Sequence, residues 1–159
     1  IGEIVMRGNT MMEGYLTEDG PVDSGIYVAE DGTRWVKTGD LAYRDEDNYY
    51  YFVGRKKRVI IISGFNVYPG DIERLMTELP FIKECCAVQG VVDGKPIVRL
   101  YTVLGESGNE EEYKQQIINL CSQRLSKYSV PRDIRFIDAL PRTRVQKVDF
   151  MSLTEELPK

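Results

Sequence analysis

The chain has 159 residues, of which 42% are hydrophobic and 29% charged, a composition that supports at least one packed core. Its 25 Asp and Glu side chains outnumber 21 Lys and Arg, and the formal net charge of -4 argues against nucleic acid or another general polyanion as a partner. Histidine is absent, which excludes Ser/His and Cys/His nucleophile pairs and mixed Cys/His zinc sites, so any catalysis depends on Lys, Arg, Asp or Glu.

No apolar run reaches the roughly 20 residues that a membrane helix needs, and no secretion signal opens the chain, so we expect a cytoplasmic protein without a transmembrane segment. The chain starts at Ile1 and enters a strand-like segment at once, and we therefore expect it to be a piece of a longer protein. Cys85, Cys86 and Cys121 lie in apolar segments, which predicts reduced thiols and no disulfide.

Residues 1–57 alternate short β-type runs with turn residues, and this pattern predicts an all-β meander. The expected strands cover residues 4–6, 26–29, 35–37, 40–43 and 49–53. So many short strands make a marginal domain with exposed edges, and we expect more sheet to precede Ile1.

Strands and helices alternate after the basic run 55–58, where we place the domain boundary. The expected elements are a hairpin over 59–68 around Ser63-Gly64, a helix from 69–71 to 79, a hairpin over 85–104 around Asp93-Gly94, a helix from Asn109 to Leu125, a strand over 134–137, a loop over 141–147 and a helix over 148–157. Residues 58–159 are thus predicted to form an α+β module.

Three side chains at predicted loop positions suggest nucleotide chemistry. Asp40 follows Thr38-Gly39 in what we expect to be a turn at a strand end, where its carboxylate can accept the hydroxyl protons of a ribose. Arg55 offers a rigid fork of donors for ribose and phosphate, and Lys147 can bring a point charge to phosphate oxygens. Each also has an ordinary alternative: a turn cap, a solvated charge run and a surface lysine, respectively.

The order and spacing of four motifs resemble the C-terminal third of the AMP-forming acyl-adenylate superfamily, which includes acyl-CoA synthetases, adenylation domains and luciferase. The motifs are Thr38-Gly39-Asp40, residues 52–57, residues 63–73, and residues 140–143 ahead of Lys147. The likeness covers nearly the whole chain, and residues 55–57 and 63–69 are most similar to long-chain fatty acyl-CoA ligases. One departure is Gln146, which stands where a glycine usually precedes the lysine.

The resemblance implies an α+β fold in which residues 1–57 are the β-rich end of a large N-terminal domain. Residues 58–159 would be a small mobile C-terminal domain with a short central sheet flanked by helices. The implied activity joins a carboxylic acid, which we expect to be a fatty acid, to CoA through an acyl-AMP intermediate. The implied cofactors are ATP and Mg²⁺, and no metal ligand is identifiable in this chain. The implied roles are nucleotide binding for Asp40, Arg55 and Phe52, hinge for Lys57, pantetheine channel for Ser63 and Gly64, and catalysis of adenylation for Lys147.

Two other functions stay open at this point. An adenylation domain that loads a carrier protein would use the same channel for a phosphopantetheine thiol. A non-catalytic α+β interaction module would leave residues 55–58 as a solvated linker and Lys147 as a surface residue. Whether the chain is part of an acyl-CoA ligase or of an adenylation domain, we expect the 159 residues alone to be unable to form acyl-AMP. Most of the adenine and acid sites would belong to the upstream domain.

Overall fold

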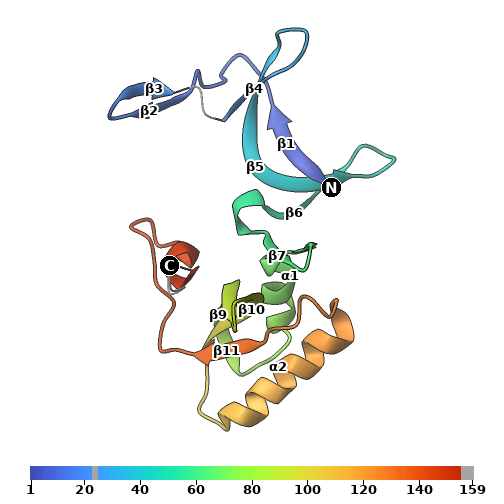
Figure 1. Ribbon diagram of the computed structural model, residues 1–159, viewed down its shortest axis with the longest axis vertical. Coiled ribbons are helices and arrows are strands. Elements are labelled where there is room, and N and C mark those ends of the chain that lie inside the picture. Colours follow the sequence, from blue (N-terminus) through green and yellow to red (C-terminus); the bar gives the residue numbers. More distant parts are fainter. Residues whose placement is uncertain (23–24, 155–159) are drawn as a thin grey trace. The chain divides into compact units, whose positions relative to one another are not determined.

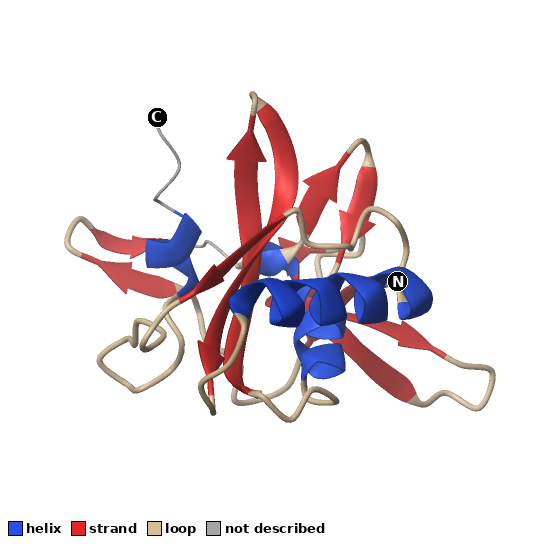
Figure 2. Cartoon of the chain, turned by 90° about the horizontal axis from the view of Figure 1, so that it is seen from below, coloured by secondary structure: helices blue, strands red, loops and turns tan. Residues whose placement is uncertain are grey.

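The computed structural model describes residues 1–22 and 25–154, and the chain divides into two compact units, residues 1–57 and residues 58–159 (Figure 1). The mixture of sheet and helix confirms the predicted α+β class. Figure 2 colours the helices blue and the strands red, and the α-helices of the described residues, α1 (Pro69–Met76), α2 (Glu110–Arg124) and α3 (Phe150–Thr154), all belong to the second unit.

The first unit is built on an antiparallel sheet in which one long strand is central. Strand β5 (Arg34–Arg44) pairs with β1 (Gly2–Met6), β4 (Ile26–Val28) and β6 (Tyr50–Arg55), and a separate hairpin joins β2 (Tyr15–Thr17) to β3 (Gly20–Val22). A short 3-10 helix, η1 (Lys56–Arg58), follows β6. The β2–β3 hairpin was not predicted, because its strands are only three residues long and one contains Gly-Pro.

The prediction of two strands, 35–37 and 40–43, separated by a turn at Thr38-Gly39 is wrong, because residues 34–44 form the single strand β5. Gly39 has φ of +73°, and the pairing with β1 shifts between Glu3↔Leu41 and Val5↔Lys37, so β5 bulges here instead of ending. A Cβ at Gly39 would meet nothing within 4 Å, so its left-handed backbone, not space, favours glycine.

The second unit is organised around a three-stranded sheet in the order β11-β10-β9. Strands β9 (Ile82–Val92) and β10 (Lys95–Leu104) form an antiparallel hairpin across Asp93-Gly94, and β11 (Asp133–Phe136) lies parallel to β10. Both turn residues have positive φ, as expected of a two-residue hairpin turn. A smaller hairpin pairs β7 (Ile60–Ile62) with β8 (Phe65–Val67).

Both faces of this sheet are covered, and successive side chains alternate between the two cores. One core combines Ala87, Val98 and Leu100 of the sheet with β7–β8, α1 (Pro69–Met76) and α2 (Glu110–Arg124). The other combines Cys86, Val88, Tyr101 and Val103 with Leu140 and with Leu153 of α3 (Phe150–Thr154). In Figure 1, α3 lies on the opposite side of β9–β11 from α1 and α2.

The helix boundaries follow from their caps. Asn109 caps α2 by accepting from the amides of Glu111 and Glu112. The last helix begins at Phe150 and not at Val148 as predicted, because Asp149 caps it: its Oδ1 accepts from the Ser152 amide at 3.3 Å and its Oδ2 from Ser152 Oγ at 2.8 Å. Residues 155–157 of the predicted helix lie outside the described residues.

Candidate functional site

The structure brings Asp40 and Arg55 together on neighbouring strands. They are register partners across β5 and β6, and Arg55 Nε lies 2.9 Å from the buried Oδ1 of Asp40. Arg55 Nη1 also donates to the Thr38 carbonyl at 3.1 Å. A carboxylate and a guanidinium side by side, with 27% and 58% of their side chains exposed, can hold a ribose and an adjoining phosphate.

Glu3 braces the bulge that presents Asp40, and sequence reasoning did not single it out. Its Oε1 accepts from the Gly39 amide at 3.1 Å, and its Oε2 pairs with Lys56 Nζ at 2.8 Å. The pKa of Glu3 is lowered, mainly by the Lys56 hydrogen bond, so the carboxylate stays charged. Glu3 therefore ties β1 to the bulge and to the residue just before Lys57.

Phe52 lies three residues before Arg55 on β6 and is paired with Ala42 of β5. Its side chain is 65% exposed, so it does not belong to a core of the described residues. An exposed aromatic ring on the strand that carries Arg55 is available to a planar ligand.

Lys57 is exposed in η1 and is the last residue of the first unit. Ser63 and Gly64 form the two-residue turn between β7 and β8, with φ of 51° and 83°. Both turn residues are exposed, so their backbone is open to a ligand.

A hollow of about 280 Å³ lies beside Ser63. Ile62, Pro96 and Tyr128 give it apolar walls, and Lys95, Lys127 and Arg132 give it three cationic side chains. Tyr128 stacks on Phe65 of β8, with ring centroids 4.2 Å apart, which fixes one wall relative to the Ser63-Gly64 turn. A hollow with this lining suits a partly apolar chain that carries phosphates.

Lys147 is exposed at the end of a tightly folded loop. Arg142 and Val148 form an antiparallel bridge, the Thr143 amide donates to the Lys147 carbonyl at 2.8 Å, and the Gln146 amide donates to the Thr143 carbonyl at 2.9 Å. Gln146 has φ of 62°, the left-handed conformation that a glycine would adopt without strain. The loop thus holds Lys147 by its backbone and leaves its ammonium group to solvent.

The two candidate sites of the second unit belong to opposite faces of its sheet. The Ser63-Gly64 turn joins strands whose Ile60 and Val67 are buried in the core with α1 and α2. Lys147 is followed by Val148 and Phe150, which pack on the core with Leu140 and Leu153. Asp40 and Arg55, by contrast, both belong to the first unit.

Sequence reasoning also missed a cluster built on Arg58, which pairs with Glu73 of α1 and lies over the ring of Phe150. Arg58 was noted only as part of a basic run. The single signal in the sequence was that this run continues past Arg55 and Lys57, and no spacing rule connects it to Phe150.

Residues 1–22 and 25–154 contain neither a cluster of metal ligands nor a membrane-spanning helix. No group of three or more His, Cys, Asp or Glu side chains among these residues is placed to hold a metal ion. None of the helices has the length and apolar character to cross a membrane.

Comparison with known proteins places these residues in a family. Residues 71–147 match the AMP-binding enzyme C-terminal domain. A long-chain-fatty-acid–CoA ligase of Escherichia coli O157:H7 is 34% identical over 157 residues, which cover 98% of this chain and 26% of the relative. The chain therefore spans about a quarter of that relative's length.

Solved structures of acyl-CoA synthetases have the same fold as this chain. The o-succinylbenzoate CoA synthetase of Bacillus subtilis, in complex with its acyl-adenylate intermediate, superposes with a TM-score of 0.78 and 27% identity over 96% of this chain and 30% of that one. The same enzyme with ATP and a magnesium ion gives 0.74 and 28% over 92% and 29%. The chain belongs to the AMP-forming acyl-adenylate superfamily and carries its AMP-binding enzyme C-terminal domain.

Proposed function

We propose that the chain is part of an ATP-dependent, AMP-forming acyl-CoA ligase, with residues 58–159 as its mobile C-terminal domain. Such an enzyme works in two steps: the acid's carboxylate attacks the α-phosphate of ATP, forming acyl-AMP and releasing pyrophosphate, and the CoA thiol then takes the acyl group and releases AMP. The long-chain-fatty-acid–CoA ligase relative favours a fatty acid as substrate.

The observation that carries the proposal is the position of the two candidate sites on opposite faces of one sheet. Adenylation needs a cation near phosphate and carboxylate oxygens, whereas thioester formation needs a path for the thiol. A domain that rotates about Lys57 would present Lys147 for the first step and the Ser63-Gly64 turn for the second. One rigid unit with two different faces can serve both steps in turn.

The first unit supplies the nucleotide contacts that both steps share. Asp40 would accept from the ribose hydroxyls, Arg55 would donate to ribose and phosphate oxygens, and Phe52 would lie beside the nucleotide. Because AMP remains bound through both steps, these contacts are expected to be used twice. They are kept in place by the β5–β6 register and by Glu3.

The hollow beside Ser63 favours CoA over a carrier protein as the thiol donor. Its cations, Lys95, Lys127 and Arg132, match the phosphates of CoA, while its apolar walls match a pantetheine chain. A magnesium ion accompanies ATP in one solved relative, and the described residues of this chain contain no group of three or more candidate metal ligands.

The test is Lys147→Ala in the complete ligase. Pyrophosphate exchange, which reports adenylation, should fall on the order of a hundred- to a thousandfold, or about 3 to 4 kcal/mol of barrier, because the developing charge loses its ammonium partner. Thioester formation from preformed acyl-AMP should continue, since Lys147 has left the site by then.

Lys83→Ala is the matched control, because it removes an exposed lysine from β9 of the same unit. Its two half-reactions should match those of the unmodified enzyme. Unchanged pyrophosphate exchange in Lys147→Ala would contradict the proposal and favour a non-catalytic module. The 159 residues alone should give no pyrophosphate exchange, and detectable exchange would show that the upstream domain is not needed.

A further inference from the structure

Arg58 is the first residue of the second unit, and its guanidinium contacts three separate elements. Nη1 and Nη2 donate to the two carboxylate oxygens of Glu73 on α1, at 3.1 Å and 2.5 Å, and Nη2 is 3.3 Å from the Ala87 carbonyl of β9. Its Cζ lies 5.3 Å from the centroid of the Phe150 ring at the start of α3.

Glu73 completes the cluster by bonding to the sheet as well. Its Oε1 accepts from the Ala87 amide at 3.0 Å, so Arg58 and Glu73 together bond both the carbonyl and the amide of Ala87. About three quarters or more of each side chain is shielded, with 24% and 21% exposed. A two-point guanidinium–carboxylate pair in such surroundings fixes direction as well as distance.

The Arg58 guanidinium remains charged in this cluster. Burial lowers the pKa of Arg58, but the hydrogen bond and charge of Glu73 outweigh it and raise the pKa overall. The cation therefore remains available to the Phe150 ring at any pH at which the protein is folded.

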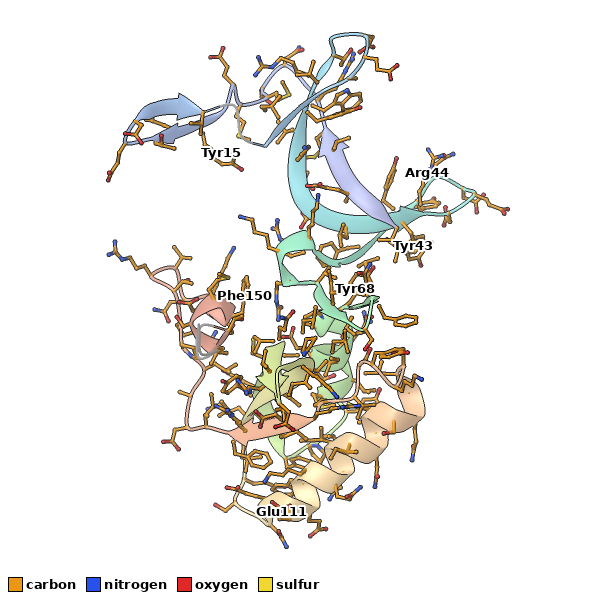
Figure 3. The ribbon with its side chains drawn as sticks, in the orientation of Figure 1. Tyr15, Tyr43, Arg44, Tyr68, Glu111 and Phe150 are labelled. Atoms are coloured by element: carbon orange, nitrogen blue, oxygen red, sulfur yellow. The ribbon has the colours of Figure 1, made fainter. Side chains whose placement is uncertain are left out.

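Phe150 links the cluster to Lys147, which precedes it by three residues. The segment between them is held at both ends: the Asp149 amide donates to the Pro141 carbonyl at 2.8 Å, and Val148 bridges to Arg142. Phe150, which is labelled in Figure 3, is the first residue of α3. A small cavity of about 80 Å³ between Arg58, Phe150 and Val148 leaves room for the ring to shift if its cationic partner is lost.

We propose that Arg58 is a positioning residue that locks the Lys147 loop to the residue next to the hinge, so that rotation about Lys57 carries Lys147 as part of a rigid body. This inference rests on the proposed function. Without Arg58, the Phe150 ring would lose its cationic partner, and only the Asp149–Pro141 hydrogen bond, the Val148–Arg142 bridge and apolar packing would hold this end of the loop. The ammonium group would then sample positions around the reacting phosphate.

The test uses the complete ligase with Arg58→Lys, which keeps the charge but loses the two-point geometry. Pyrophosphate exchange should fall on the order of tenfold, because displacements near 1 Å can cost up to about a hundredfold. Thioester formation from preformed acyl-AMP should change by about twofold or less, since Lys147 takes no part in it. A variant that merely destabilised the fold would lower both rates together.

Phe150 provides a second pair of variants in case Arg58→Lys fails to fold. Phe150→Leu keeps an apolar side chain but removes the ring, and should lower the rate of pyrophosphate exchange by several-fold. On a logarithmic scale, this loss should be about half or more of the loss caused by Arg58→Lys. Phe150→Tyr keeps the ring and should preserve the rate. Arg99→Lys is the matched control, because it also weakens a shielded arginine–carboxylate pair, with Asp133 of β11.

The decisive comparison introduces Arg58→Lys into Lys147→Ala. If Arg58 acts through Lys147, it should cause no further loss of pyrophosphate exchange there. An equal fractional loss in both backgrounds, equal damage to both half-reactions, or no loss at all would overturn the inference. Failure of the proposed function would give a different result, because Lys147→Ala alone would then leave pyrophosphate exchange intact.

Discussion

The two units of the chain differ most in how completely they bury their apolar side chains. In the first unit, Ala42 is the only buried hydrophobic residue among those described. Its tyrosine side chains and Phe52 are open to solvent, with Tyr49, Tyr50 and Phe52 between 65% and 67% exposed. The second unit has a separate core on each face of its sheet.

This difference shows that a sheet is not by itself a domain. Strand β5 has ladder partners along much of its length, so the first unit satisfies its backbone, yet no layer among its described residues covers its side chains. The second unit has helices on both faces and gains the hydrophobic free energy that the first lacks. The first unit is therefore expected to depend on a covering layer from elsewhere.

Separating the two units is the strongest way to break this comparison. Residues 58–159 expressed alone should unfold in one cooperative transition in urea, whereas residues 1–57 alone should show none, because roughly 57 residues without a core cannot offset the entropy of ordering the chain. Circular dichroism would follow both fragments, and the fluorescence of Trp35, the one tryptophan of the chain, would also follow residues 1–57. A cooperative transition in residues 1–57 would refute the comparison.

The same contrast explains which parts of the fold could be predicted from sequence. The hairpin around Asp93-Gly94 and helix α2 have local signals, namely turn residues and an apolar stripe, and the structure has both. The bulge at Gly39 has no such signal, because a glycine after a polar residue is equally typical of a turn. Only the pairing of β5 with β1 shows that Gly39 forms a bulge and not a turn.

In the candidate site, too, some residues could be predicted from the sequence and others could not. Asp40 and Arg55 were chosen for their chemistry and their place in a motif, and the β5–β6 register brings them within 2.9 Å. The carboxylates that contact the Gly39 bulge and Arg58 were not predicted. Glu3 is 36 residues from Gly39, and Glu73 is 15 residues from Arg58, so only tertiary structure reveals these two contacts.

The thiols sharpen the comparison, because all three cysteines of the chain lie in the second unit, where Cys86 and Cys121 are buried and Cys85 is partly buried. Burial raises the pKa of Cys85 and Cys86 from 9.0 to about 12 and that of Cys121 to about 11. At pH 8 the first two should carry on the order of a thousandfold less thiolate than at their ordinary pKa. Labelling by a disulfide reagent should therefore be slow until urea unfolds this unit.

The same shifts set the direction of a pH effect. A thiol whose pKa is raised in the folded state contributes stability that is fully present below about pH 9, its unfolded value, and is lost as pH rises toward about 12. The urea midpoint of residues 58–159 should fall over this interval. Rapid labelling at pH 8 in the absence of urea would show that the thiols are not held in a core.

The smallest expected effect concerns two turns within the second unit, one of which has a glycine at its left-handed position while the other does not. Gly64 has φ of 83°, and Gln146 has φ of 62°. A left-handed residue with a Cβ costs about 1 to 2 kcal/mol, and glycine's extra freedom in the unfolded chain costs about 0.4 to 1 kcal/mol. Gln146→Gly should therefore raise the unfolding free energy by about 0.5 kcal/mol.

Gly64→Ala is the matched opposite change and should lower the unfolding free energy by about 1 kcal/mol, because a Cβ at Gly64 meets no atom within 4 Å and the cost is conformational alone. Urea denaturation of residues 58–159 measures both. An unchanged or lower midpoint in Gln146→Gly would mean that the Gln146 side chain makes interactions that offset its backbone strain. In that case the residue before Lys147 stiffens the loop by its side chain, and Gln146→Gly should also slow pyrophosphate exchange in the complete ligase.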